Sequence, residues 1–175
     1  MDGHFLLTSG LHSDVYWEKM RVVQNPKFTE RLCSIIAEHC KNTDIDLVAG
    51  PITAGIILAY EVAKKLDKPC IFAEKAGNER QFKRGIQLKK DDKVLVVDDI
   101  LTTGKSVNEV INAVEQAKAK VVSIAVLVDR SQDGLEFGSI PLFSCLRAPS
   151  KAFEPSCCPL CKKNMPLTIL GGGKT

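Results

Sequence analysis

KVLVVDDILTTGKS, residues 93–106, is the stretch that decides the fold class of this 175-residue sequence. Its four consecutive apolar residues, 94–97, are typical of a strand buried on both faces of a parallel sheet. Two carboxylates, Asp98 and Asp99, follow where we expect that strand to end, and a loop of hydroxyls and glycine then leads into a helical pattern. Ligands of open α/β sheets bind outside the carboxyl ends of the strands. This stretch therefore predicts a ligand site.

The loop and the two carboxylates favour different parts of one ligand. N–H groups and hydroxyls at the start of a helix bind anions, and the helix dipole favours negative charge there. Carboxylates instead need sugar hydroxyls, or a divalent cation held jointly with the ligand. A sugar phosphate satisfies both requirements. A Walker loop does not fit, because the acidic pair stands where its first glycine would be. The weaker alternative is that Asp98 and Asp99 only cap a turn before an ordinary loop.

Length and composition indicate an ordinary globular protein that forms one domain. The apolar fraction of 45% and the charged fraction of 26% are those of typical globular chains, and the net charge of +3 is too small to indicate nucleic-acid binding. We find no run long enough to span a membrane and no signal peptide. Seven cysteines, an odd number, favour reduced thiols. We therefore expect a cytoplasmic protein without a membrane or nucleic-acid partner.

Strands and helices alternate along the rest of the sequence. Residues 3–17 predict a short β-ribbon, and further strands are expected at 46–49, 69–73 and 121–128. The alternation predicts an α/β fold with a doubly wound parallel sheet. A first helix should begin with Asn25 as its cap and Pro26 at its first position, and the residues on one of its faces are Phe28, Leu32, Ile35, Ile36 and, as a packing residue, His39. Two later helices are marked by Ile56, Ile57, Tyr60, Ala63 and Leu66, and by Val107, Val110, Ile111 and Val114.

Three further segments are candidates for the same site. Residues 50–55, GPITAG, follow a strand and contain glycines that would let the backbone approach a pyrophosphate closely. Residues 74–85 are charged and lack clear periodicity, so they are either a solvated loop or a mobile lid over a polyphosphate. Arg130 follows the last buried strand, where an arginine can bind a planar carboxylate through two N–H groups or form a surface ion pair.

The C-terminal region contains one C-x-x-C motif, formed by Cys158 and Cys161. A structural zinc site needs four ligands. Cys157, Cys145 or a distant histidine would have to complete it. Zinc and simple reduced thiols both stay open at this point.

Residues 93–106 and several further motifs carry a resemblance that covers nearly the whole sequence. Residues 93–106 resemble the binding motif for phosphoribosyl pyrophosphate (PRPP) of type I phosphoribosyltransferases. GHFLLTSGLHS near the start, AGPITAGIILA in the middle, FAEK before the lid and VDR after the last strand are similar to the orotate-specific members. CPLC near the end is similar to a bacterial and archaeal subgroup.

The resemblance implies the type I phosphoribosyltransferase fold, a parallel twisted sheet flanked by helices with a small hood from the N- and C-terminal segments. It implies one domain over residues 1–175, with hood segments at 1–24 and about 145–170 and a PRPP-binding core at 25–140. Family members usually have an N-terminal helix before the ribbon, and this sequence begins after that point, so either the sequence is truncated or the protein lacks part of its hood and of its dimer contact. Thr8 and Ala54 stand where well-studied members carry lysines, and the lid is shorter than theirs.

The activity implied is Mg²⁺-dependent transfer of ribose 5-phosphate from PRPP to orotate, which gives orotidine 5′-monophosphate and pyrophosphate for pyrimidine (UMP) biosynthesis. Asp98 and Asp99 would hold the ribose hydroxyls and stabilise positive charge at the anomeric carbon, with Lys75 as a third catalytic residue. Mg²⁺ would be held mainly by PRPP, with the two aspartates as candidate protein ligands. A homodimer is also implied, in which the lid of one subunit reaches the neighbouring site.

The resemblance carries these roles to individual residues. The implied PRPP-binding residues are Asp98, Asp99, Ile100, Leu101, Thr102, Thr103, Gly104, Lys105, Ser106, Thr53, Ala54, Lys75 and Arg80. Lys83 and Arg84 are further lid cations, and the implied orotate-binding residues are Thr102, Arg130 and Tyr16. Two alternatives stay open: a phosphoribosyltransferase for a purine base, and a non-catalytic PRPP-binding regulator.

Overall fold

The computed structural model describes residues 1–7, 10–77, 79–85, 87–149 and 151–170. By its internal contacts the chain divides into a larger unit, Lys19–Ala148, and a smaller unit, Met1–Glu18 with Pro149–Thr175. The boundaries expected for the hood segments, near residues 24 and 145, therefore lie a few residues inside the larger unit.

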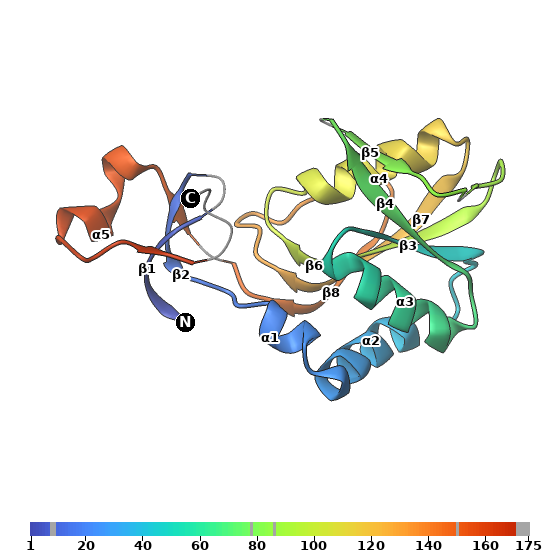
Figure 1. Ribbon diagram of the computed structural model, residues 1–175, viewed down its shortest axis with the longest axis horizontal. Helices are drawn as coiled ribbons and strands as arrows, with labels where there is room; N and C mark the ends of the chain where they lie inside the picture. The colour runs from blue at the N-terminus through green and yellow to red at the C-terminus, as the bar shows by residue number, and fades with distance from the viewer. Residues whose placement is uncertain (8–9, 78, 86, 150, 171–175) are drawn as a thin grey trace. The chain divides into compact units, whose positions relative to one another are not determined.

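A six-stranded sheet in strand order β5-β4-β3-β6-β7-β8 forms the centre of the described part of the larger unit (Figure 1). Neighbouring strands pair in parallel, except that β5 runs antiparallel to β4. The predicted parallel sheet is confirmed, with one antiparallel strand added at its edge. The strands are β3 (Leu47–Pro51), β4 (Cys70–Ala76), β5 (Glu79–Phe82), β6 (Lys93–Leu101), β7 (Lys120–Asp129) and β8 (Leu142–Arg147).

Helices cover both faces of this sheet, as Figure 1 shows. The helices are α1 (Met20–Val23), α2 (Pro26–Cys40), α3 (Ala54–Leu66) and α4 (Lys105–Gln116). Because successive side chains of a strand point to opposite faces, Val94 and Val96 of β6 pack with the α4 residues, whereas Leu95 and Val97 pack with α2 and α3. The prediction that residues 94–97 are buried on both faces is confirmed. Within the described residues, no helix is long and apolar enough to cross a membrane.

Strand β6 is longer than predicted. Asp98 and Asp99 lie within it, not after its end, and the strand continues to Leu101. Its partner β7 extends equally far, so that Asp98 pairs with Val126 and Leu101 with Asp129. Strand pairing satisfies backbone N–H and C=O groups whatever the polarity of the side chains. The change from apolar to acidic residues therefore did not mark the strand end.

The predicted apolar face of the first helix was partly wrong. Phe28 and Ile35 of α2 are 58% and 44% exposed, and His39 is also exposed, although its ring stacks on that of Phe143 with the centroids 3.9 Å apart. Ile36 is buried as predicted, and the other buried residues of α2 are smaller side chains that were not predicted: Thr29, Cys33, Ala37 and Cys40. Ile57 and Tyr60 of α3 are exposed in the same way, whereas all four residues predicted for α4 are buried.

The first helix begins at Pro26 as predicted, with Asn25 at the cap position. The Asn25 side chain makes no capping hydrogen bond. The backbone carbonyl oxygen of Asn25 accepts hydrogen bonds from the backbone N–H groups of Phe28 and Thr29. The backbone, and not the amide side chain, therefore closes the first turn of α2.

The segment expected to be a loop or lid forms a β-hairpin. Strands β4 and β5 pair with Lys75 opposite Arg80 and Ala76 opposite Glu79. Gly77 has a φ of +64° in the turn between them, a conformation that glycine adopts without strain. The charged composition hid this pairing, because an edge strand needs only a few inward side chains.

The smaller unit joins the two ends of the chain in one four-stranded sheet of its described residues, in strand order β10-β1-β2-β9. The predicted ribbon is present as the antiparallel pair β1 (Asp2–Leu6) and β2 (His12–Val15), whereas Thr8 lies outside the described residues. C-terminal strands flank this pair on both sides. The remaining elements are β9 (Ala152–Phe153), the 3₁₀ turn η1 (Pro155–Cys157), α5 (Pro159–Lys162) and β10 (Thr168–Ile169).

Candidate functional site

The candidate site lies between β3 and β6, where the connections of the larger sheet leave toward opposite sides: the chain crosses from β3 to β4 and from β6 to β7. Pairing of β3 with β6 ends at Ala49 and Val96, whereas β3 continues beside β4 to Pro51 and β6 continues beside β7 to Leu101. The two halves of the sheet therefore separate at the carboxyl ends of β3 and β6. Such a topological switch point is where ligands of open α/β sheets bind.

Asp98 and Asp99 are buried at this point, with exposed fractions of only 6% and 5%. The backbone N–H of Asp99 donates to Asp98 Oδ1 at 2.8 Å, and that of Ile100 donates to Asp99 Oδ1 at 2.6 Å. Burial of carboxylates is costly unless donors or cations compensate for the lost water. Two adjacent acids held in this way indicate a functional site and not a packing role.

Lys19 supplies a cation to this pair. Its Nζ lies 2.8 Å from Asp99 Oδ2, and its side chain is about half exposed. Lys19 was not among the residues predicted for the site. Lys19 is 80 positions away from Asp99 and belongs to no recognisable pattern, so no signal in the sequence could have identified it.

Burial raises the pKa of Asp98 to about 6, and the charge of neighbouring Asp99 adds to the increase. Hydrogen bonds from the Asp99 N–H and the Ser106 hydroxyl, together with the charge of Lys19, act in the opposite direction. The Asp98 carboxyl therefore changes its protonation state near pH 6, well above the range of an ordinary aspartate.

The loop after β6 presents polar groups at the start of α4. Thr102, Thr103 and Lys105 are exposed, and the Lys105 N–H donates to Thr103 Oγ1 at 3.4 Å. Gly104 has a φ of +73°, and a Cβ there would lie 3.2 Å from Leu135 Cδ1, so both the backbone conformation and the available space favour glycine. The first N–H groups of a helix have no partner within it. The loop therefore offers N–H groups and hydroxyls to an anion, and phosphate binding there stays a prediction.

Arg80 of the hairpin connects to this loop. It is 6% exposed, and its Nη2 donates to Ser106 Oγ at 3.2 Å, while its Nε lies 3.2 Å from Glu109 Oε2 of α4. Ser106 in turn donates to Asp98. Sequence analysis placed Arg80 among the lid cations, but its charge is compensated inside the chain, and it positions the loop serine. Glu109 was not predicted to take part.

Residues 50–55 connect β3 to α3 at the same edge of the sheet. A Cβ on Gly50 would lie 2.2 Å from the Gly55 oxygen, and one on Gly55 would lie 2.7 Å from Pro51 Cδ. These glycines therefore allow close packing between the strand and the helix, and the approach of this backbone to a pyrophosphate stays a prediction. Thr53 is exposed at the cap position of α3, whereas Ala54 is buried.

The remaining predicted residues lie in three places. Arg130 is buried directly after β7 and is not a surface residue. Its backbone N–H donates to the backbone oxygen of Leu101 at 2.8 Å. Lys75 is exposed on β4, opposite Arg80 in the hairpin. Tyr16 belongs to the smaller unit, where its ring centroid is 5.6 Å from that of Phe5. The structure thus brings the acidic pair, Ser106 and Arg80 into one connected network.

Comparison with known proteins agrees with this geometry. Residues 21–144 match the phosphoribosyl transferase domain. The orotate phosphoribosyltransferase of Caldanaerobacter subterraneus subsp. tengcongensis is 42% identical to this chain, over 98% of this chain and 90% of its own length. That of Caldicellulosiruptor bescii is 40% identical, over 99% of this chain and 91% of its own length. The crystal structure of orotate phosphoribosyltransferase from Aeropyrum pernix superposes with a TM-score of 0.70 at 27% identity, covering 84% of this chain and 86% of that one. The chain belongs to the orotate phosphoribosyltransferase family and has the type I phosphoribosyltransferase fold.

Proposed function

We propose that the protein transfers the 5-phosphoribosyl group of PRPP to orotate, giving orotidine 5′-monophosphate and pyrophosphate in pyrimidine biosynthesis. In this reaction the bond from the anomeric carbon to pyrophosphate oxygen breaks, a bond to an orotate ring nitrogen forms, and the nitrogen releases its proton. The observation that carries the proposal is the buried pair Asp98 and Asp99, placed at the sheet's switch point directly before the anion-binding loop of α4.

The loop 102–106 is the proposed cradle for the 5-phosphate of PRPP. It offers exposed hydroxyls of Thr102 and Thr103 together with the first N–H groups of the 12-residue helix α4. The helix dipole favours a dianion at this position. The residues assigned to PRPP are those from Asp98 to Ser106, including Ile100, Leu101, Gly104 and Lys105.

The acidic pair is the proposed site of the ribose ring. Its buried carboxylates can accept hydrogen bonds from the ribose hydroxyls and stabilise the positive charge that develops at the anomeric carbon when pyrophosphate departs. The donors that now occupy them include Lys19, which is half exposed and therefore able to give way to a sugar hydroxyl. Water exclusion strengthens these electrostatic effects.

The pyrophosphate end of PRPP is assigned to the second loop and to the hairpin. Thr53 is exposed at the start of α3, and Ala54 follows it as the first helical residue. The Lys75 ammonium is exposed and suits the leaving group's charge. Arg80 serves this end indirectly, because it holds Ser106.

Mg²⁺ is proposed as the cofactor. Carboxylate and phosphate oxygens are its preferred ligands, and Asp98 and Asp99 provide such oxygens. Backbone N–H groups, Ser106 and Lys19 already engage them, which favours a metal held mainly by PRPP with the aspartates as secondary ligands. When bound, Mg²⁺ neutralises charge on the departing pyrophosphate.

Orotate is assigned to Arg130 and Thr102 of the larger unit. Arg130 follows directly from the carboxyl end of β7, and its backbone N–H is bonded to Leu101 at the end of β6. A guanidinium suits the planar carboxylate of orotate, which purine bases lack. Selectivity for orotate over purines is therefore expected to depend on this residue.

We propose a homodimer in which the β4–β5 hairpin of one subunit serves the neighbouring site. Exposed apolar side chains on α2 and α3, which include Phe28, Ile57 and Tyr60, are suited to burial against a second copy. A mixture of Asp99→Asn and Lys75→Ala chains, each inactive alone, should regain part of the activity after subunit exchange. No recovery from a mixture that light scattering shows to be dimeric would contradict the sharing of sites. The compartment proposed is the cytoplasm, which suits the seven free cysteines.

The test is orotate consumption followed by ultraviolet absorbance in the presence of PRPP and Mg²⁺. We expect Asp99→Asn to lower kcat by at least about 100-fold, as the loss of a preorganised electrostatic contact does in other enzymes. Asp91→Asn, a change of an exposed aspartate outside the site, is the matched control and should leave turnover intact. Turnover of a purine base but not orotate would establish the first alternative. PRPP binding without turnover of any base would establish a non-catalytic regulator.

A further inference from the structure

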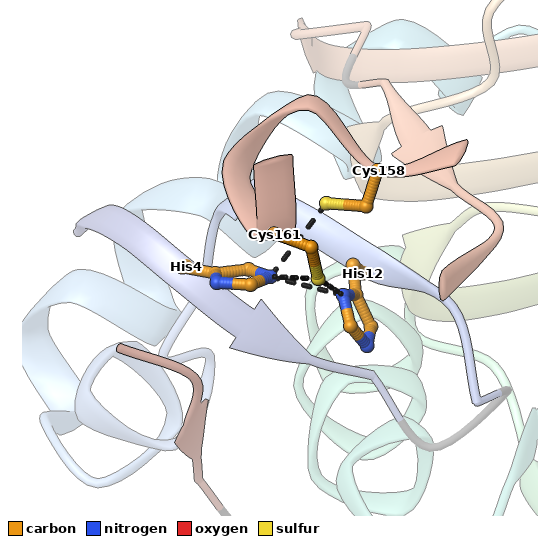
Figure 2. Close-up of side chains that lie close together, drawn as sticks. All are labelled: His4, His12, Cys158 and Cys161. Atoms are coloured by element: carbon orange, nitrogen blue, oxygen red, sulfur yellow. Dashed lines mark hydrogen bonds between the residues drawn. The ribbon is translucent and has the colours of Figure 1, made fainter. Parts of the chain in front are cut away.

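Four metal-ligating side chains meet in the smaller unit. Figure 2 shows His4 and His12, which come from the β1–β2 pair, pointing toward Cys158, directly before α5, and Cys161 within it. One ligand atom from each residue lies within 4.8 Å of all the others. The cluster therefore joins segments more than 140 residues apart in the sequence.

The hydrogen bonding of His4 prepares it as a ligand. Its Nδ1 lies 2.8 Å from the carbonyl oxygen of Met165, which can only accept, so Nδ1 carries the proton of the neutral ring. The lone pair is then on Nε2, which faces the other three residues. A ligating histidine that donates its second N–H to a carbonyl is the usual arrangement around protein-bound metals.

Three of the distances among the four ligand atoms match those of a tetrahedral zinc site, and all six lie within 4.8 Å. Zn–N bonds of about 2.0 Å and Zn–S bonds of about 2.3 Å place neighbouring ligand atoms roughly 3.3 to 3.8 Å apart. His4 Nε2 lies 3.6 and 3.7 Å from the sulfurs of Cys158 and Cys161, and His12 Nδ1 lies 3.3 Å from that of Cys161. The two imidazole nitrogens are 2.9 Å apart and would need to move outward by about 0.4 Å to reach this range.

The smaller unit has little apolar core to hold it together. Among its described residues only five are buried, and three of these are candidate ligands: Phe5 and Ser13 are buried together with His4, His12 and Cys158. Both apolar core clusters consist entirely of residues from the larger unit. A unit of this size usually needs disulfides or a metal when its core is small, and its cysteines form no disulfide.

We propose that His4, His12, Cys158 and Cys161 bind one structural Zn²⁺ ion, which fastens the N-terminal hairpin to the C-terminal segment. Two thiolates and two neutral imidazoles compensate the charge of the ion completely, so the loaded site suits burial. Four protein ligands leave no open position, which makes the site structural and not catalytic. Binding releases two protons, one from each thiol. The proposal does not depend on the transferase activity.

Two other cysteines considered in the sequence as ligands do not join this cluster. Cys157 is exposed, and its Sγ lies 3.6 Å from the Glu154 oxygen. Cys145 belongs to the larger unit, where its Sγ faces the oxygen of Leu32. Two distant histidines, His4 and His12, complete the ligand set of the C-x-x-C motif. Cys157 is adjacent to a ligand without being one, and it is therefore a matched control.

The test measures metal directly. Full-length protein expressed in zinc-supplemented medium should carry one zinc per chain by plasma mass spectrometry. Cys158→Ser and Cys161→Ser should lose it, whereas Cys157→Ser should retain it. Co²⁺ added to chelator-treated wild type under reducing conditions should produce thiolate-to-cobalt charge-transfer absorption and the visible bands of tetrahedral cobalt, and Zn²⁺ should displace it.

The proposal is overturned if wild type carries no zinc and Co²⁺ gives no charge-transfer absorption. It is also overturned if Cys157→Ser loses as much metal as Cys158→Ser. If the ligand variants do not fold, the wild-type cobalt spectrum and the Cys157→Ser metal content still decide the question. Tetrahedral bands without thiolate charge transfer would place the metal elsewhere and contradict this ligand set.

Discussion

The two units of this protein differ in how much apolar core they contain. The larger unit buries two apolar layers against a parallel sheet, and its polar residues are buried mainly at the carboxyl ends of the strands. The smaller unit buries few apolar side chains in its described part, and most of its buried residues are polar. The larger unit can therefore tolerate a costly acidic pair, because burial of apolar area supplies stability elsewhere. The smaller unit has no such reserve, and its cohesion is expected to depend on four ligating side chains.

The largest effect on stability should come from the core of the larger unit. Leu95→Ala removes a fully buried side chain from β6, which should lower the free energy of unfolding by about 2–5 kcal/mol. Leu146→Ala, a change of a half-exposed leucine in β8, is the control and should cost under about 1 kcal/mol. Urea denaturation of the two variants measures the difference. Equal losses would show that the sheet does not depend on its two apolar layers.

Asp98→Asn should stabilise the protein while it abolishes activity. The folded-state pKa of about 6 exceeds the ordinary value of 3.8, so the folded state binds more protons between these values. Stability therefore falls as pH rises from about 4 to 6, by up to roughly 3 kcal/mol, and that cost persists at higher pH. We expect the variant to unfold at higher urea concentration at pH 8, with the advantage lost at pH 4. Asp99→Asn, whose carboxylate is paired with Lys19, should show no comparable gain. An unchanged stability at pH 8 would contradict the cost assigned to Asp98.

The cysteines of the two units should differ in how fast they react with a thiol reagent. Burial raises the pKa of Cys33 to about 12 and those of Cys70 and Cys145 to about 11, and it also raises that of Cys40. These four thiols of the larger unit should react slowly with a thiol reagent at pH 8. In the zinc-loaded protein only Cys157 should react rapidly. Without the ion the smaller unit is expected to open and expose Cys161 and Cys158, which is buried in the folded chain, so chelation should increase the number of fast thiols from one to three. If the number of fast thiols is the same before and after chelation, the smaller unit does not depend on a metal more than the larger unit does.

The smallest expected effect concerns Lys19. Its charge lowers the pKa of Asp98, so Lys19→Ala should move the acid limb of the kcat/KM profile to higher pH. A half-exposed ion pair contributes about 0–1 kcal/mol, which corresponds to a shift below about 0.7 pH units. Lys19→Arg retains the charge and should restore the profile. A shift to lower pH would contradict the electrostatic role of Lys19.

Sequence reasoning worked best where the chemistry is contiguous. Residues 94–106 combine the buried strand, the acidic pair and the anion-binding loop in one stretch, so their order alone predicted the site. It failed where a partner lies far away. Lys19 meets Asp99 and Arg80 meets Ser106 only after the sheet has formed, and a single sequence carries no signal for such pairs.

By itself, the amino-acid sequence determined the α/β class and the buried parallel strand at residues 94–97, and it predicted a ligand site directly after that strand, because apolar periodicity and local turn chemistry act between near neighbours. Only the tertiary structure decided that β6 continues through the acidic pair, that the presumed lid is a hairpin with Arg80 buried, and that His4 and His12 meet Cys158 and Cys161. The physical reason is that strand length and side-chain clustering depend on partners brought together from distant parts of the chain. A ligand set divided between the two ends of 175 residues becomes visible only when those ends pair in one sheet.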